Sequence, residues 1–175
     1  MASTDQGPHT SEDGLAEPGP APTGWRDYTS AIYGSVLAAT VVVSAGDLRS
    51  PIALVVLLLG SGFVFWIAHA YAATVSSRHG GWTLGAIRRT MQHEWPIAFA
   101  AVPPAIAAGV LGLLPGVTVT AGAWVALIVA LVEQQVWGYA AARQARLPRS
   151  ELIVTILLNL VVGFIIVGLK VAVGH

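Results

Sequence analysis

Five long apolar runs constrain the fold of this chain more than any other feature of its sequence. The runs cover about residues 28–45, 51–75, 95–114, 117–142 and 152–173. A helix needs roughly 20 apolar residues to cross a bilayer, and its backbone polar groups must be hydrogen-bonded within the segment. The runs therefore predict an all-α membrane protein, a bundle of five transmembrane helices. The first run is the shortest and contains Ser30, Tyr33 and Ser35, so it is the weakest candidate span.

Composition excludes several classes of protein. Hydrophobic residues make up 55% of the chain and charged residues 10%, whereas soluble domains carry roughly 25% charged residues. No basic patch is present, so nucleic acid is not an expected partner. With no cysteine, the chain has no thiolate metal site and no cysteine nucleophile. Because no nucleophile–base pattern is visible either, we expect no enzyme, no metal and no cofactor.

The first 24 residues differ from the rest of the chain. This segment contains four prolines and four acidic residues but no lysine or arginine. Such a composition cannot bury enough apolar surface to offset its chain entropy. We predict a disordered acidic tail over residues 1–24 and a transmembrane helical domain over residues 25–175.

The basic residues predict the orientation of the bundle. With five crossings, seven of the nine basic residues lie on the side of the N-terminus: Arg26, Arg78, Arg88, Arg89, Arg143, Arg146 and Arg149. Arg49 and Lys170 lie on the other side. The positive-inside rule then predicts a plasma-membrane protein with its N-terminus in the cytoplasm and its C-terminus outside. A four-span alternative without the first run moves only the N-terminus.

The segment from Trp82 to Trp95 has the spacing of an amphipathic helix. Apolar side chains recur at helical intervals, at Leu84, Ile87, Met91 and Trp95. Such a helix lies along a membrane surface, and its basic residues Arg88 and Arg89 are candidates for contact with anionic headgroups. An ordinary cytoplasmic loop helix explains the pattern equally well.

Polar residues inside the spans point to a functional site. At a rise of about 1.5 Å per residue, Glu133 lies about 13 Å from the cytoplasmic end of its span, Asn159 about 11 Å, His69 about 9 Å and Tyr33 about 8 Å. All four side chains thus fall in the cytoplasmic half of the bilayer. Glu133 and Asn159 each share a helix face with small residues, which favours an inward position.

Glu133 and His69 are the predicted ion- or proton-handling pair. A charged carboxylate near a helix centre costs roughly 2.5–3.5 kcal/mol and marks a functional site by default. Imidazole exchanges protons in the physiological pH range, so His69 is the expected partner. Asn159 and Tyr33 are expected to hydrogen-bond to the site. In the alternative interpretation these side chains only fix helix packing.

The third run contains Pro103 and Pro104. Two prolines remove two backbone donors and clash with the preceding turn, so they predict a kink or break that frees the carbonyls near Phe99 and Ala100. Interrupted helices are a feature of transporter binding sites. A kink that only shapes packing is the alternative.

Three stretches of the sequence resemble a known group of proteins. They are Ala31-Ile32-Tyr33-Gly34, Phe65 to Ala72 (FWIAHAYA) and Glu94-Trp95-Pro96. Together with Glu133 and Lys170 they resemble a group of small integral membrane proteins of high-GC Gram-positive bacteria. The resemblance implies a bacterial membrane protein and carries no activity.

Together these observations predict a small channel or transporter for protons, cations or a small solute. Glu133 is its predicted titratable group and His69 the pH-sensitive partner. Five helices make a thin wall for a pathway, so a homo-oligomer is expected. The alternative is a non-catalytic membrane scaffold or regulatory subunit.

Overall fold

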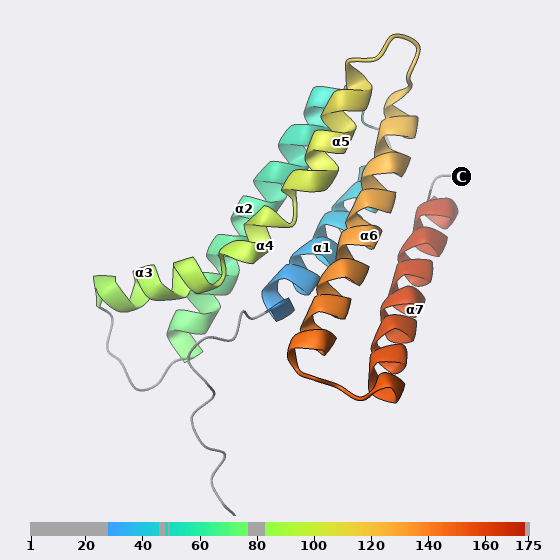
Figure 1. Ribbon diagram of the computed structural model, residues 1–175. Helices are drawn as coiled ribbons and strands as arrows, with labels where there is room; N and C mark the ends of the chain where they lie inside the picture. The colour runs from blue at the N-terminus through green and yellow to red at the C-terminus, as the bar shows by residue number, and fades with distance from the viewer. Residues whose placement is uncertain (1–27, 46–47, 49, 77–82, 174–175) are drawn as a thin grey trace, which may run out of the picture.

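The computed structural model describes residues 28–45, 48, 50–76 and 83–173. These residues form seven helices and no strand (Figure 1): α1 Tyr28–Ser44, α2 Pro51–Ser76, α3 Leu84–His93, α4 Trp95–Phe99, α5 Val102–Gly112, α6 Val119–Gln144 and α7 Arg149–Val173. The predicted tail over residues 1–24 lies outside the described residues, as do Trp82, Arg26, Arg49 and Arg78.

Within the described ranges, four helical segments are long and apolar enough to cross a membrane. They are α2, the pair α4–α5 taken together as Trp95–Gly112, α6 and α7. The chain therefore has the helices of an integral membrane protein. The remaining apolar helix, α1, has 17 residues and is about 26 Å long, shorter than the roughly 30 Å hydrocarbon core. The fifth span predicted at α1 is thus not confirmed by the length of this helix and stays a prediction.

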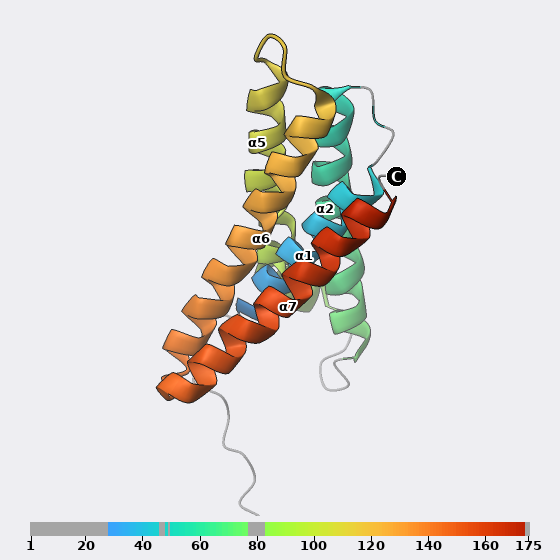
Figure 2. The ribbon, with the colours of Figure 1, turned by 90° about the vertical axis from the view of Figure 1, so that its right-hand side faces the viewer.

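The short helix α1 occupies the centre of the bundle. It packs against α2, α4, α6 and α7, and Figure 2 shows it between α2 and the pair α6 and α7. Its buried face consists mainly of small side chains: Ser30, Ala31, Gly34, Ser35, Ala38, Ala39, Val42 and Val43. Small residues let helix backbones approach closely, so α1 touches four neighbours despite its length.

The third apolar run is interrupted at Ala100 and Ala101. Helix α4 ends at Phe99, and α5 begins at Val102 with the two prolines in its first turn. Proline is tolerated there because first-turn N–H groups have no partner within the helix. The carbonyls of Phe99 and Ala100 lose the donors that residues 103 and 104 would otherwise supply.

Two glycines, one in α1 and one in α2, pack closely against this interruption. A Cβ on Gly34 of α1 would lie 2.7 Å from the carbonyl oxygen of Ile97, and a Cβ on Gly62 of α2 would lie 2.7 Å from the Cβ of Ala101. Ala100 and Ala101 are buried. Irregular backbone at membrane depth is tolerated where protein covers it, and here α1 and α2 provide that cover.

Helix α3 leaves the bundle and crosses the end of α2 (Figure 1). Its first residue follows Thr83, whose side chain accepts a hydrogen bond from the Ala86 N–H at 3.2 Å, as in an N-cap. No residue of α3 is buried. The helix is held to α2 by the Trp66 indole, which donates to the carbonyl of Met91 at 2.9 Å.

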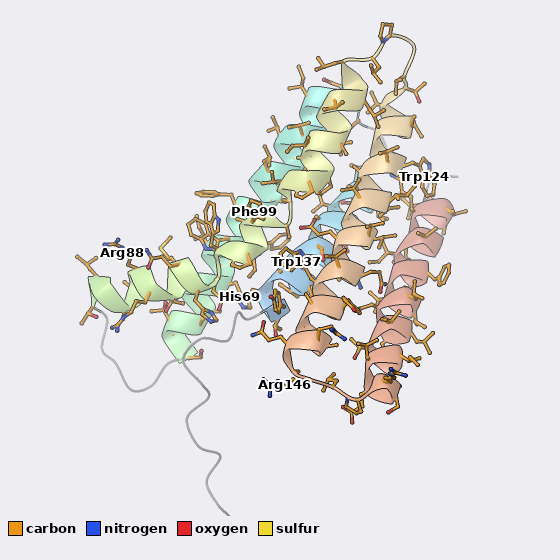
Figure 3. All side chains as sticks on the ribbon, in the orientation of Figure 1. His69, Arg88, Phe99, Trp124, Trp137 and Arg146 are labelled. Carbon is orange, nitrogen blue, oxygen red and sulfur yellow. The ribbon has the colours of Figure 1, made fainter. Side chains whose placement is uncertain are left out.

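The connections of the bundle gather at two ends. The start of α1, the end of α2, helix α3 and the α6–α7 connection share one end, and the α5–α6 connection and the end of α7 share the other (Figure 1). In Figure 3, Arg88 and Arg146 lie toward the first end and Trp124 toward the second.

The close approach of α2 to the interruption predicts unequal effects for two glycines of the same helix. Gly62→Ala should lower the free energy of unfolding by about 1–3 kcal/mol, because the new methyl meets Ala101. Gly60→Ala has open space around its Cβ and should be neutral or stabilising by up to about 1 kcal/mol. Denaturant unfolding in detergent micelles measures both values, and equal destabilisation would contradict this packing.

Candidate functional site: a buried carboxyl between two imidazoles

Glu94 lies at the joint between α3 and α4. Its N–H donates to the carbonyl of Thr90 at 3.0 Å, and its carbonyl accepts from the N–H of Ile97 at 3.1 Å, so the residue ends one helix and starts the next. The chain changes direction at this point (Figure 1). Glu94 is buried, whereas its neighbours His93 and Trp95 are exposed. The change of direction therefore turns a single carboxyl inward.

Three other side chains surround this carboxyl. The Ser30 hydroxyl of α1 donates to Oε2 of Glu94 at 2.6 Å. His69 Nε2 of α2 lies 3.5 Å from Oε2, and His93 Nδ1 lies 3.4 Å from Oε1. We call these four residues the Glu94 cluster. It joins three successive helices, α1, α2 and α3, through residues up to 64 positions apart in the sequence.

The cluster is buried on one side and open on the other. The side chain of Glu94 is 10% exposed, whereas those of His69 and His93 are 45% and 54% exposed. The ring of Tyr33 in α1 lies against the His69 ring, with 5.7 Å between centroids. The imidazoles thus stand between the carboxyl and the surroundings of the bundle. Because imidazole both accepts and donates protons near neutral pH, this order of groups suits proton transfer to and from a buried acid.

The Glu94 cluster contains two imidazoles and one carboxyl, which are ligand types that metals use. Among the described residues, no group of three or more His, Cys, Asp or Glu side chains is arranged to hold a metal ion. A carboxyl that accepts a hydroxyl hydrogen bond and contacts two imidazoles can still bind a proton or attract a cation.

A second group of polar contacts joins α6 to its neighbours. Gln134, which is 1% exposed, lies with its Nε2 3.5 Å from both the carbonyl oxygen and Oδ1 of Asn159 in α7. Gly138 provides the space for the amide of Asn159. One acceptor, Oε1 of Gln134, is buried and has no hydrogen-bond partner among the described residues. Asn159 thus belongs to the α6–α7 contact.

Glu133 lies at the edge of the buried face of α6. The indole of Trp137 donates to Oε1 of Glu133 at 3.1 Å. Oε2 is buried and no described residue hydrogen-bonds to it. The ring of Trp137 packs on Tyr28 of α1, with 5.7 Å between centroids. The carboxyl of Glu133 is therefore held by its own helix, close to the start of α1.

Lys170 forms a third polar contact between helices. Its Nζ, in the last turn of α7, donates to the carbonyl of Val42 at 2.9 Å, and the lysine is buried. Val42 lies in the last turn of α1, where helix carbonyls have no intrahelical donor. An ammonium group at a helix C-terminus is also favoured by the helix dipole. This contact attaches α7 to the end of the central helix.

The structure separates the residues expected to form one site. Tyr33 and His69 are together, whereas Asn159 and Glu133 lie in contacts of α6. The acid beside His69 is Glu94, and the expected pairing of His69 with Glu133 is not formed among the described residues. The physical reason is that α1 lies between α2 and α6 (Figure 2), so similar depth in the bilayer does not bring the two side chains together.

Four polar residues of the Glu94 cluster and of the Gln134–Asn159 contact were not predicted as site residues from the sequence: Ser30, His93, Glu94 and Gln134. For Gln134 a signal exists, because small residues recur every four positions at Ala126, Ala130, Gly138 and Ala142 and Gln134 falls in this row. For Glu94 the signal is an acidic residue directly before a Trp-Pro helix start, at the border of an apolar run. For Ser30, no sequence signal identifies its partner.

The predicted headgroup-contact residues lie on α3. Arg88 and Arg89 are exposed, and the Nε of Arg89 donates to the carbonyl of Gly85 at 3.3 Å. Both side chains are outside the Glu94 cluster.

Comparisons of the chain with protein-family models, with curated proteins and with solved structures find no match. A helical fold alone does not determine an activity. The functional evidence is therefore the chemistry of the Glu94 cluster and its place in the bundle.

The hydrogen bond from Ser30 to Glu94 predicts a measurable contribution to stability. Ser30→Ala should lower the free energy of unfolding by about 1–3 kcal/mol, because a buried carboxyl oxygen loses its donor. Ser44→Ala is the matched control, since that hydroxyl is exposed and donates to Val41 within its own helix, and its effect should stay within about 0.5 kcal/mol. Denaturant unfolding in micelles distinguishes the two, and a neutral Ser30→Ala variant would contradict the contact.

Proposed function

We propose that the protein is a small oligomeric membrane channel or transporter for protons or cations, with Glu94 as its titratable group. The observation that carries the proposal is the buried carboxyl of Glu94 with its two more exposed imidazoles, His69 and His93. Of this cluster, His69 lies within the candidate spanning helix α2, and ionisable groups in membrane segments mark ion pathways and proton relays. In this mechanism the imidazoles exchange protons with the cytoplasmic side, and the carboxyl accepts them or attracts a cation.

The distribution of basic residues supports an entrance to the site from the cytoplasmic side. Helix α3, the end of α6, the α6–α7 connection and the start of α7 share one end of the bundle (Figure 1). These segments carry Arg88, Arg89, Arg143, Arg146 and Arg149. An excess of basic residues is typical of the cytoplasmic side. With α1 as a fifth span, the N-terminus is inside and the C-terminus outside the plasma membrane.

The tight packing of α1 and α2 against the interrupted span favours protons over hydrated ions as cargo at this place in one copy. The cavity between α1, α2 and the interrupted span has a volume of about 10 Å³, which is the least space that holds one water. A hydrated ion does not pass through such a space. Protons can pass along side chains, and a wider pathway for cations requires the faces of several copies.

Proton flux tests the proposal. We expect liposomes containing the purified protein to take up protons at a rate that changes between pH 5 and pH 8. Glu94→Gln should abolish the flux or its pH dependence, because the amide still accepts the Ser30 hydrogen bond but does not titrate. Dye-reported internal pH under a potassium-diffusion potential measures the rate.

Two matched variants control this experiment. Glu151→Gln removes an exposed acid from the first turn of α7 and should leave flux unchanged. Glu133→Gln removes the acid bound to Trp137 and should keep the pH dependence. If Glu133→Gln abolishes the pH dependence of the flux and Glu94→Gln does not, the proposed site is wrong. If neither the wild-type protein nor any variant carries protons or cations, the proposal of transport is wrong.

A non-catalytic scaffold or regulatory subunit is the second candidate. The contacts of Lys170 with Val42 and of Gln134 with Asn159 favour it, because each joins two helices and fixes their register. This candidate predicts a folded protein without flux.

A further inference from the structure

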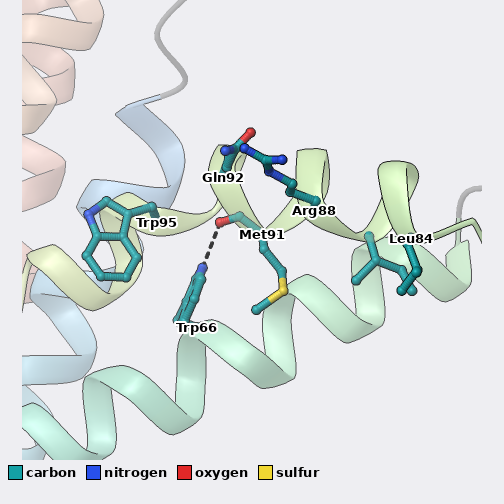
Figure 4. A pocket seen from close by; sticks show the side chains of 7 residues that line it. Trp66, Leu84, Arg88, Met91, Gln92 and Trp95 are labelled. Carbon is teal, nitrogen blue, oxygen red and sulfur yellow. Dashed lines mark hydrogen bonds between the residues drawn. The ribbon is translucent and has the colours of Figure 1, made fainter.

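An apolar groove lies between α2 and α3. Its volume is about 710 Å³, within the range of small-molecule sites, and it is lined by Trp66, Leu84, Ile87, Arg88, Met91, Gln92 and Trp95. In Figure 4 the side chains of Trp66, Met91 and Leu84 lie between the two helices. We call this space the α2–α3 groove. Its lining is thus almost wholly apolar, with two polar residues from α3.

The walls of the groove are held in place by two contacts of Trp66. Its indole N–H donates a hydrogen bond to the carbonyl of Met91 at 2.9 Å. Its ring meets the ring of Trp95 edge-on, with 5.0 Å between centroids. Because the indole N–H is already bonded, Trp66 presents only apolar ring surface to the groove. The angle between α2 and α3 is therefore fixed by the same side chain that forms the wall.

The polar rim of the groove carries an available positive charge. Arg88 and Gln92 are one helical turn apart and lie side by side on α3 (Figure 4). Within the described part of the chain, the guanidinium of Arg88 makes no hydrogen bond or ion pair. A guanidinium has five donors in a planar fork that matches phosphate oxygens, and the Gln92 amide adds further donors. This pair can hold one phosphate group.

The surroundings of the groove identify its occupant. The groove lies beside α2, which is long and apolar enough to cross a membrane, and at the end of that helix where α3 crosses it. An apolar space next to a phosphate-binding rim, at the end of a spanning helix, matches a lipid with its acyl chain in the bilayer and its headgroup at the surface. The unpaired positive charge favours an anionic headgroup.

We propose that the α2–α3 groove binds one anionic phospholipid, whose acyl chain packs on Trp66, Met91 and Trp95 and whose phosphate binds Arg88 and Gln92. The lipid fills the angle between α2 and α3 and so stabilises the position of α3. Because α3 ends at His93, next to Glu94, the bound lipid also supports the joint that turns Glu94 inward. The proposal depends on membrane embedding and not on transport.

Lipid titration of the delipidated protein tests the proposal. Dioleoyl phosphatidylglycerol and dioleoyl phosphatidylcholine are added separately in detergent, and native mass spectrometry counts the lipids retained per copy. We expect one tightly retained phosphatidylglycerol and weaker retention of phosphatidylcholine. Arg88→Gln should lower the affinity for phosphatidylglycerol roughly tenfold, the effect of losing a charge-assisted contact.

Arg89→Gln is the matched control, because it removes the same charge from the next residue, which is outside the groove and donates to Gly85. It should leave the affinity unchanged. Equal losses in the two variants, or equal retention of the two lipids, would overturn the proposal in favour of unspecific attraction to the surface. Displacement of the lipid by millimolar inorganic phosphate would contradict the proposed contribution of the acyl chain to binding.

A second measurement does not depend on any variant. A phosphatidylglycerol with a photoreactive group in its acyl chain is irradiated in liposomes with the wild-type protein, and the labelled peptides are sequenced. The proposal predicts labels on Trp66, Met91 or Trp95 that excess unlabelled phosphatidylglycerol removes. Labels spread evenly over the exposed faces of α6 and α7 would contradict a site in the groove.

Discussion

The close approach of α1 and α2 to the interrupted span is the constraint on which the rest of the structure depends. Gly34 and Gly62 leave room for the backbone around Ala100 and Ala101, where two prolines prevent a continuous helix. Side chains at either glycine would separate the three segments. With the segments in contact, the joint at Glu94 lies beside Ser30 of α1 and His69 of α2. The packing of small residues thus produces the polar cluster.

Three buried polar contacts lower the cost of placing polar groups in apolar surroundings. Glu94 accepts from Ser30, Lys170 donates to Val42, and Gln134 contacts Asn159. Each of these contacts joins two helices, so each also sets their register. Among the residues that the structure describes, only the Glu94 cluster adds two exposed imidazoles to a buried acid. This difference separates a candidate functional site from contacts that serve packing.

Much of the fold is predictable from the sequence, because length and hydropathy determine which segments can cross a bilayer. The four spanning segments and the amphipathic pattern of α3 follow in this way, as does an interruption near Pro103. The sequence does not predict which helices are neighbours. The depth of a residue in the bilayer and its face on the helix do not say which helices touch. Similar depth therefore predicts a pair of His69 and Glu133, although α1 lies between their helices. Gln134, not Glu133, occupies the buried face of α6, because a shift of one residue turns a helix by about 100°.

The histidine side-chain nitrogen resonances of the protein in micelles test the central claim most directly, namely that Glu94 is the acid between His69 and His93. The chain has five histidines, and single His→Gln variants assign their signals. The account predicts that Glu94→Gln shifts the ring resonances of His69 and His93, whereas Glu133→Gln leaves all five in place. Unchanged His69 and His93 signals in Glu94→Gln, or a shift of His69 in Glu133→Gln, would contradict it.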